Sequence, residues 1–262
     1  MSSGGGPTSP PRLLVVQHEP GTGAGWWGEW LAATGLGLDV RHPYRDGDLP
    51  SLETYDGMLV LGGAMGPSDD DACPWLPQTR ARLADAMSSG LPTVGICLGA
   101  ELLTVACGGR VERGASGPEL GVLALNLEPG AAQDRVLGAL PAAPRVLQWP
   151  WEAMTELPPG AVNLASSPAY PHQAFRLGAR AWGVQGHPEV TPQIAAEWAR
   201  EDSPLLAAAG RAPADLVAEL TAATDELVAT WAPVAAAFAS VVHEQARPPG
   251  TPTARGSPRW PG

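Results

Sequence analysis

The chain has 262 residues and a formal net charge of −11 at pH 7, with an apolar fraction of 44% that is typical of a globular domain. The acidic excess argues against a nucleic-acid backbone as the main partner, because neutralising phosphates takes clustered basic side chains. Three cysteines, odd in number and widely spaced, do not form the framework of a disulfide-stapled secreted protein.

Short apolar runs alternate with segments of helical periodicity in the first half of the chain. Near-continuous apolar strands of this kind are typical of a parallel sheet with helices on both faces. The expected strands are 12–17, 36–41, 57–61 and 92–96, and the expected helices are 29–34, 77–89 and 101–106. The sequence therefore predicts an α/β fold built on an open, mainly parallel twisted sheet.

The second half begins with strand candidates that are separated only by turns, which predicts a small antiparallel extension beside the parallel core. These candidates are 120–127, 145–149, 161–166, 173–177 and 181–184. Thr191 and Pro192 then form a good helix start. Helices are expected over 191–200 and 213–245, the second bent or broken at Pro233.

Four regions follow from this pattern. A domain over 12–190 carries a C-terminal helical extension, 191–246, packed on it, and the tails 1–11 and 247–262 are expected to be disordered. Residues 1–11 lack the cationic start and apolar stretch of a signal peptide, and the apolar runs are too short to span a bilayer. We therefore expect a cytoplasmic protein with no membrane partner.

Cys97 lies where an apolar strand meets a helix, with Gly95 and Gly99 on either side. Glycines permit a sharp turn that pushes the side chain out at the carboxyl end of the sheet. The helix N-terminus is expected to favour the thiolate, and the N–H of Leu98 is expected to hold an oxyanion. A free cysteine in this place is otherwise a small buried core residue, so the local pattern alone leaves both interpretations open.

His187 and Glu189 favour the catalytic interpretation. They follow the strand over 181–184, at the sheet end where catalytic groups gather in open α/β folds. Glu189 is two residues from the imidazole and suited to orient it. The set Cys97, His187 and Glu189 supplies a nucleophile, a base and an orienting carboxylate for thiolate acyl transfer.

The segments Gly-Ile-Cys97-Leu-Gly and Gln185-Gly-His187-Pro-Glu189 resemble the paired signatures of class I glutamine amidotransferases, a Cys-His-Glu triad family. The resemblance runs from about residue 13 to 189. The segments 69–76 and 109–114 look like the stand-alone subgroup related to the glutaminase domain of GMP synthase.

The resemblance implies a flavodoxin-like fold and hydrolysis of glutamine through a γ-glutamyl thioester, with neither cofactor nor metal. The turn at Gly62 and Gly63 resembles the family's second oxyanion-hole loop. It implies Gly63 and Leu98 as the oxyanion donors, and Gly62 and Glu101 as substrate contacts.

Three positions depart from the family pattern. Glu101 stands where the family commonly has Gln, and a carboxylate there accepts from an α-ammonium but repels an α-carboxylate. Pro150 and Glu152 stand where related proteins often have His and an acidic residue, and we expect them at the pocket rim. Gly186 stands where an aromatic residue is usual, which predicts a wider or looser site beside the base. These departures put the substrate in question more than the reaction.

Three functions therefore stay open. The first is glutamine hydrolysis for a separate synthase subunit, because the chain shows no P-loop and no ATP-pyrophosphatase motif. The second is a γ-glutamyl peptidase with a larger amine as leaving group. The third is a catalytically weak homologue that binds and regulates a partner.

A glycine motif, Gly23-Ala-Gly25-Trp-Trp-Gly28, matches the dinucleotide-binding fingerprint. Two tryptophans at the helix start and Glu19 just upstream are unfavourable for a pyrophosphate. We expect this loop to pack beside the active site or at an interface instead.

Overall fold

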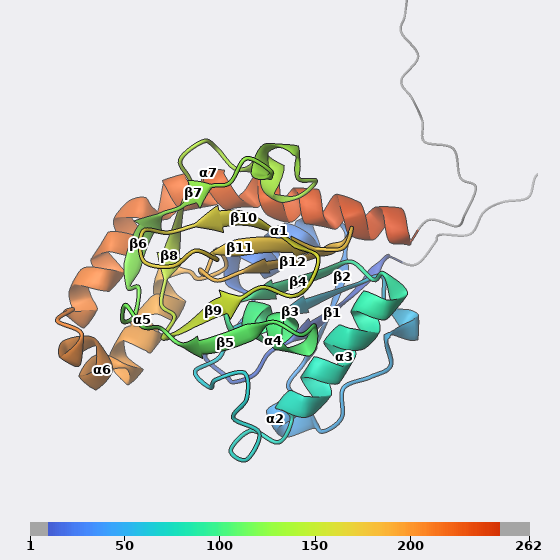
Figure 1. Ribbon diagram of the computed structural model, residues 1–262, viewed down its shortest axis with the longest axis horizontal. Coiled ribbons are helices and arrows are strands. Elements are labelled where there is room, and N and C mark those ends of the chain that lie inside the picture. Colours follow the sequence, from blue (N-terminus) through green and yellow to red (C-terminus); the bar gives the residue numbers. More distant parts are fainter. Residues whose placement is uncertain (1–9, 247–262) are drawn as a thin grey trace, which may run out of the picture.

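A computed structural model describes residues 10–246 (Figure 1). The predicted tails 1–11 and 247–262 lie outside the described residues, apart from residues 10 and 11. An eight-stranded sheet forms the centre, in the order β2-β1-β3-β4-β12-β11-β10-β7.

Five neighbouring strands of this sheet run parallel. They are β1 (Arg12–Val16), β2 (Gly37–Arg41), β3 (Gly57–Val60), β4 (Thr93–Ile96) and β12 (Ala181–Val184). Antiparallel strands continue the sheet beyond β12. They are β7 (Asn126–Leu127), β10 (Ala161–Ser166) and β11 (Ala174–Leu177). The predicted α/β fold with a mainly parallel sheet and an antiparallel extension is confirmed.

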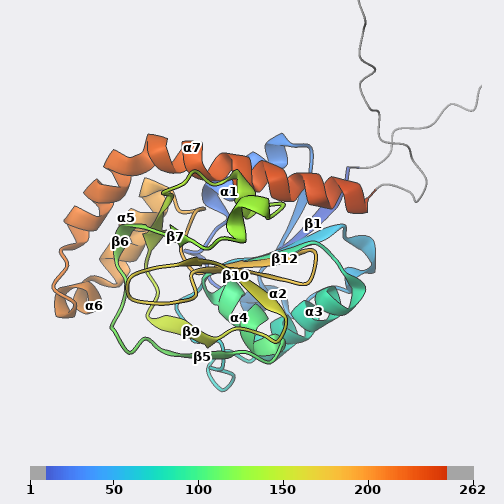
Figure 2. The same cartoon turned by 45° about the horizontal axis from the view of Figure 1, so that its top comes forward.

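Helices cover both faces of the sheet (Figure 2). Alternation along β1 shows why: Leu13 and Val15 join the apolar core on one face, whereas Leu14 and Val16 join the core on the other. The first core includes side chains of α1 (Gly25–Ala33) and α7 (Pro213–Gln245). The second includes side chains of α3 (Leu76–Ser89) and α4 (Leu98–Ala106).

Shorter elements complete the fold. Two antiparallel pairs lie outside the main sheet, β5 (Arg110–Arg113) with β9 (Glu152–Glu156), and β6 (Gly121–Ala124) with β8 (Arg145–Gln148). The remaining helices are α2 (Pro43–Asp46), α5 (Pro192–Glu201) and α6 (Ser203–Ala208), with 3-10 turns at Leu52–Thr54, Ala131–Gln133 and Leu137–Ala139.

Several elements differ from their predicted form. The run 120–127 is divided between β6 and β7 at Leu125, which belongs to neither strand. Its N–H donates to the carbonyl of Pro144. The pair β5–β9 was not expected, since β5 is largely exposed and charged and carries no apolar signal. The first helix begins at Gly25 rather than near residue 29.

Helix α7 is one continuous helix that curves along its length (Figure 1), so of the two predicted forms, bent or broken at Pro233, the break is wrong. Packing on both sides of the proline holds it: the Trp231 indole donates to the Arg145 carbonyl at 2.8 Å, and Val234 and Phe238 are fully buried. By length and composition α7 also passes as a membrane span, with a mean hydropathy of 1.3, which the expectation from short apolar runs missed. Half of that apolar window is buried inside the protein.

Candidate active site

Cys97 lies on a strained turn between β4 and α4. Its φ of 49° and ψ of −114° make it the one non-glycine residue with positive φ within residues 10–246. Gly95 and Gly99 allow the turn to close: a Cβ on Gly95 would lie 2.4 Å from the Gly99 carbonyl, and a Cβ on Gly99 would lie 2.1 Å from the Val60 carbonyl. The predicted strand–turn–helix around Cys97 is therefore present.

His187 and Glu189 form a buried pair just after β12. Their Nδ1 and Oε1 atoms are 2.8 Å apart, and the side chains are 4% and 3% exposed. The carboxylate accepts, so Nδ1 carries the proton and Nε2 is left to act as a base. The His187 N–H donates to the Leu147 carbonyl at 2.7 Å, and the Trp198 ring meets the imidazole edge-on at 4.8 Å between centroids. The contacts with Glu189, Leu147 and Trp198 thus hold the His187 imidazole in one orientation.

Gly62 brings the thiol and the imidazole together. A Cβ on Gly62 would lie 3.6 Å from Cys97 Cβ and 3.0 Å from His187 Cε1, so any side chain here would separate the two. Gly63 packs on Leu98, with a Cβ position 2.8 Å from the Leu98 Cδ2 atom. The two residues predicted as oxyanion donors are therefore neighbours, whereas Gly62, predicted as a substrate contact, lies between the Cys97 and His187 side chains rather than on the cavity wall.

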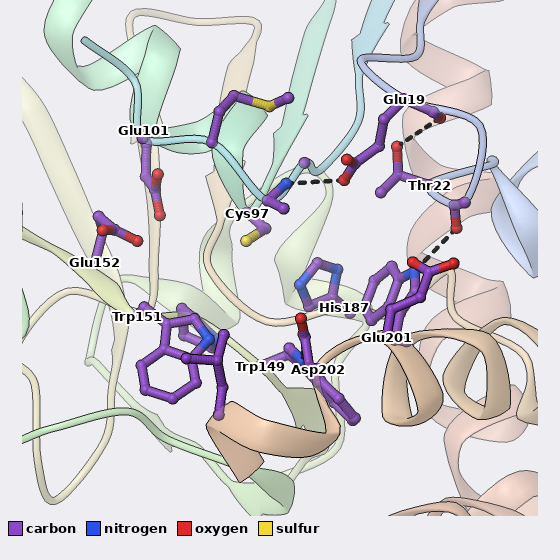
Figure 3. A pocket seen from close by; sticks show the side chains of 18 of the residues that line it. Glu19, Thr22, Cys97, Glu101, Trp149, Trp151, Glu152, His187, Glu201 and Asp202 are labelled. Atoms are coloured by element: carbon purple, nitrogen blue, oxygen red, sulfur yellow. Dashed lines mark hydrogen bonds between the residues drawn. The ribbon is translucent and has the colours of Figure 1, made fainter. Parts of the chain in front are cut away.

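A cavity of about 500 Å³ opens at Cys97, Gly63 and His187. Figure 3 shows Glu101, Trp151 and Glu152 on one side of Cys97, with Glu19, Glu201 and Asp202 on the side of His187. Pro150 and Glu152 line the cavity, which confirms the prediction that they form part of its rim. Within residues 10–246 no group of three His, Cys, Asp or Glu side chains is placed to hold a metal ion.

The surroundings of the Cys97 thiol disfavour its ionised form. Burial raises its pKa well above the ordinary value, the carboxylates of Glu101 and Glu189 raise it further, and the Leu98 N–H opposes the shift. The Leu98 N–H at the start of α4 favours the thiolate, as predicted for the helix N-terminus, but burial and the neighbouring carboxylates act more strongly in the opposite direction.

Glu101 is 3% exposed and faces the cavity one helical turn after Cys97. Its Oε1 accepts a hydrogen bond from Gln185 Nε2 at 2.8 Å, and the same amide nitrogen lies 3.9 Å from the Cys97 sulfur. Burial raises the pKa of Glu101 to about 7 despite this hydrogen bond, with Glu152 adding to the shift. A carboxyl group that changes charge near neutral pH thus stands beside the nucleophile.

Gly186 does not widen the site. A Cβ here would lie 2.6 Å from Val146 Cγ1 and 3.1 Å from the Leu147 carbonyl, so Val146 already fills the space where the family pattern led us to expect a missing ring. The glycine motif at the start of α1, residues 23–28, was expected either beside the active site or at an interface. It packs beside the site, because the Trp26 N–H donates to the Glu189 carbonyl at 2.9 Å.

Other cavity residues were missed from the sequence. Arg113, on β5, pairs with Glu152 at 3.2 Å and stacks over the Trp151 ring at 4.9 Å. Glu201 and Asp202 come from the end of α5, in the segment assigned only to the helical extension. No local motif marks these residues, because they reach the cavity only through tertiary packing.

Comparison with known proteins shows the family to which the chain belongs. The sequence model of the family "Glutamine amidotransferase class-I" matches residues 31–200. The chain belongs to this family. Gamma-glutamyl peptidase 5 of Arabidopsis thaliana is 27% identical over 154 residues, covering 57% of this chain and 61% of the peptidase.

Two further amidotransferase relatives extend the match. A glutamine-hydrolyzing GMP synthase subunit of Methanoculleus marisnigri is 30% identical over 188 residues, covering 70% of this chain and 91% of that protein. The crystal structure of glutamine amido transferase from Methylobacillus flagellatus matches with a TM-score of 0.77 at 26% identity, covering 95% of this chain and 100% of that one. The resemblance to class I glutamine amidotransferases and to GMP synthase glutaminases is thereby confirmed.

Proposed function

We propose that this class I amidotransferase hydrolyses a γ-glutamyl amide through a thioester on Cys97. The observation that carries the proposal is the strained Cys97 turn beside the 2.8 Å His187–Glu189 pair, with both catalytic side chains opening onto one cavity. This set supplies a nucleophile, a proton acceptor and an orienting carboxylate in contact with the space for a substrate.

In the first half-reaction, His187 takes the thiol proton as the Cys97 sulfur attacks the γ-carbonyl carbon. The N–H groups of Gly63 and Leu98 are the proposed donors to the resulting oxyanion. The C–N bond then breaks, the amine leaves with the proton from His187, and a γ-glutamyl thioester remains.

In the second half-reaction, water attacks the thioester while His187 accepts a proton from it. The carbon–sulfur bond breaks, glutamate leaves, and the proton returns to the thiol. Glu189 holds the imidazole orientation through both steps, and Gly62 keeps the sulfur and the ring close enough for the transfers.

The wall beside Glu101 suits the amino-acid end of a γ-glutamyl group. Glu101 and Glu152 are acceptors for an α-ammonium, and Arg113 is a donor for an α-carboxylate. The positive charge of Arg113 offsets the repulsion that Glu101 alone would exert on that carboxylate. Glutamine is the simplest compound with this end group.

A larger γ-glutamyl substrate is favoured by a specific observation. The cavity of about 500 Å³ lies in the range that accommodates drug-sized ligands, and it continues past His187 to Trp149, Trp198 and the end of α5. This leaves room for an amine bigger than ammonia, as in a γ-glutamyl peptidase.

Glutamate release from glutamine and from a panel of γ-glutamyl peptides and amides tests the proposal. Labelling of Cys97 by the γ-glutamyl electrophile diazo-oxo-norleucine, read by intact-protein mass spectrometry, provides a readout without turnover. We expect release from at least one substrate, and we expect Cys97→Ala to abolish both release and labelling. No release from any substrate together with no labelling would refute the function and favour a binding role.

Labelling without glutamine turnover calls for a second assay, in which a separate synthase subunit is added in trans. Activation of glutamine hydrolysis by that protein would favour an amidotransferase role. Turnover of γ-glutamyl amides by the chain alone would favour the peptidase.

A further inference from the structure

The catalytic cavity is strongly acidic on the side of His187. Glu19, Glu201 and Asp202 line this side, and within residues 10–246 none of the three forms an ion pair with an Arg or His side chain. Their hydrogen bonds come from neutral donors: Glu19 Oε1 accepts from the Ala64 N–H, and Asp202 Oδ2 accepts from the Trp149 indole, both at 2.8 Å. Their negative charge is therefore uncompensated.

The three carboxylates act on one another. Burial raises the pKa of Glu19, and the nearby charges of Glu201 and Asp202 add to that shift against the Ala64 hydrogen bond. Residues from two distant parts of the chain, the loop after β1 and the end of α5, thus place like charges around the His187 end of the cavity (Figure 3).

Aromatic rings lie at the same end of the cavity. Trp198 contacts the His187 ring, and Trp149 meets Trp198 edge-to-face at 5.8 Å between centroids. Carboxylates combined with indole rings favour an organic cation, which gains from both the charge and the ring faces. An anionic group would meet repulsion here.

The leaving amine must lie on this side of the cavity. His187 is 5% exposed, lines the cavity, and its Nε2 has no hydrogen-bond partner in the described part of the chain. In the proposed reaction this nitrogen delivers the proton to the departing amine. Whatever is attached to that amine is therefore directed toward Trp149, Trp198 and the three carboxylates.

We propose that the preferred substrate is a γ-glutamyl amide whose amine part carries a second, positively charged amino group: a γ-glutamyl conjugate of an aliphatic diamine or polyamine. Its distal ammonium binds among Glu19, Glu201 and Asp202, and its methylene chain lies along Trp149 and Trp198. Hydrolysis breaks the amide C–N bond by the two steps above, with water as co-substrate, and releases glutamate and the free diamine. This inference rests on the proposed γ-glutamyl hydrolysis.

Three amides of similar length that end in groups of different charge test it. They are the γ-glutamyl amides of butylamine, of 1,4-diaminobutane and of 4-aminobutyrate, which end in a methyl group, an ammonium and a carboxylate. We expect kcat/KM to fall in the order cationic, neutral, anionic, and we expect the cationic advantage to shrink as added salt screens the charges. Glutamate release is the readout for all three.

Two variants locate the effect. Each partly exposed ion pair contributes a preference of up to about fivefold, so Glu201→Gln with Asp202→Asn should reduce the cationic-to-neutral ratio of kcat/KM by a factor between about 2 and about 25. Asn at 202 keeps an oxygen acceptor for the Trp149 indole, and thermal unfolding checks the fold. Glu197→Gln removes an exposed charge from the same helix without lining the cavity, and should leave the ratio unchanged.

The outcomes separate this inference from the function on which it rests. Equal or faster turnover of the neutral amide, or an undiminished cationic preference in the double variant, overturns the diamine inference while γ-glutamyl hydrolysis stands. Failure of all three amides and of glutamine, with Cys97 unlabelled, overturns both.

Discussion

Replacing Glu101 by Gln isolates one buried ionisable group beside the nucleophile. Gln has nearly the same shape, and its carbonyl oxygen can accept the 2.8 Å hydrogen bond that Gln185 Nε2 now donates to Glu101. The substitution therefore removes the titration and the negative charge but keeps the contact. Any change in pH dependence then belongs to the carboxyl group.

The size of the effect follows from the displaced pKa. Burial raises the pKa of Glu101 from its ordinary 4.5 to about 7, and each unit corresponds to about 1.4 kcal/mol, so the ionised carboxylate costs the folded state about 3 kcal/mol. Between these values the folded protein binds more protons than the unfolded chain. The stability contributed by this group is therefore complete below about pH 4.5 and is lost as the pH rises through 7.

Urea unfolding of the wild type and of Glu101→Gln at about pH 5 and about pH 8 measures this loss. The free energy of unfolding of the variant should gain about 3 kcal/mol relative to the wild type between the two pH values. Glu197→Gln, which removes an exposed carboxylate on α5, controls for the change in net charge. Stability differences that stay constant with pH would refute the assignment of a buried, displaced carboxyl group.

The same variant tests the coupling to catalysis. Loss of the Glu101 charge should lower the pKa of the Cys97 thiol, so the pH profile for alkylation of Cys97 should move to lower pH. Turnover of glutamine should also change. Unchanged glutamine kinetics would show that Glu101 does not contribute to substrate choice.

Three further substitutions probe the supporting structure. Glu189→Gln should lower kcat roughly 10²- to 10⁴-fold with little change in KM, because the imidazole loses its charged acceptor; a loss under tenfold in steady-state kinetics would contradict that role. Gly186→Ala should cost about 1–3 kcal/mol in chemical denaturation, since its Cβ would lie 2.6 Å from the Val146 side chain, and adding Val146→Ala should recover most of that loss. Gly25→Ala, with φ of +42° and a Cβ position 2.1 Å from the Glu189 carbonyl, should reduce both stability and activity, whereas Gly23→Ala, with nothing within 4 Å, should do neither.

The sequence predicted the parts of the fold that depend on local pattern. Buried strands such as β1 and β4 are continuous apolar runs, and the turn at Cys97 carries its own glycines. Strand β5 could not be predicted from local pattern, because it is charged and mostly exposed and is held by pairing with β9. At Pro233 the sequence allowed a bend or a break, and the break is absent because burial on both sides of the proline overrides a local helix breaker.

The candidate site was likewise predicted only in part. Cys97, His187 and Glu189 lie in compact segments whose spacing suggests their chemistry, although their triad role stays a prediction until Cys97 is tested. The raised pKa of the Cys97 thiol could not be predicted from the sequence, because it depends on how deeply the thiol is buried and on Glu101. The acidic end of the cavity could not be predicted either, since Glu19 and Asp202 are far apart along the chain.

The negative charge of the cavity carboxylates has opposite effects on the Cys97 thiol and on the proposed substrate. Negative charge near Cys97 raises the pKa of its thiol and disfavours attack, which in isolation weakens catalysis. The carboxylates that raise this pKa are Glu101, Glu189 and Glu152, whereas the proposed cation binds among Glu19, Glu201 and Asp202 in the same cavity. Its positive charge should lower the cost of forming the thiolate when the correct substrate is present. Glutamine brings no second cation and gains no such advantage. We therefore expect slower turnover of glutamine than of a γ-glutamyl diamine, and we expect the alkylation rate of Cys97 to rise when free 1,4-diaminobutane is added.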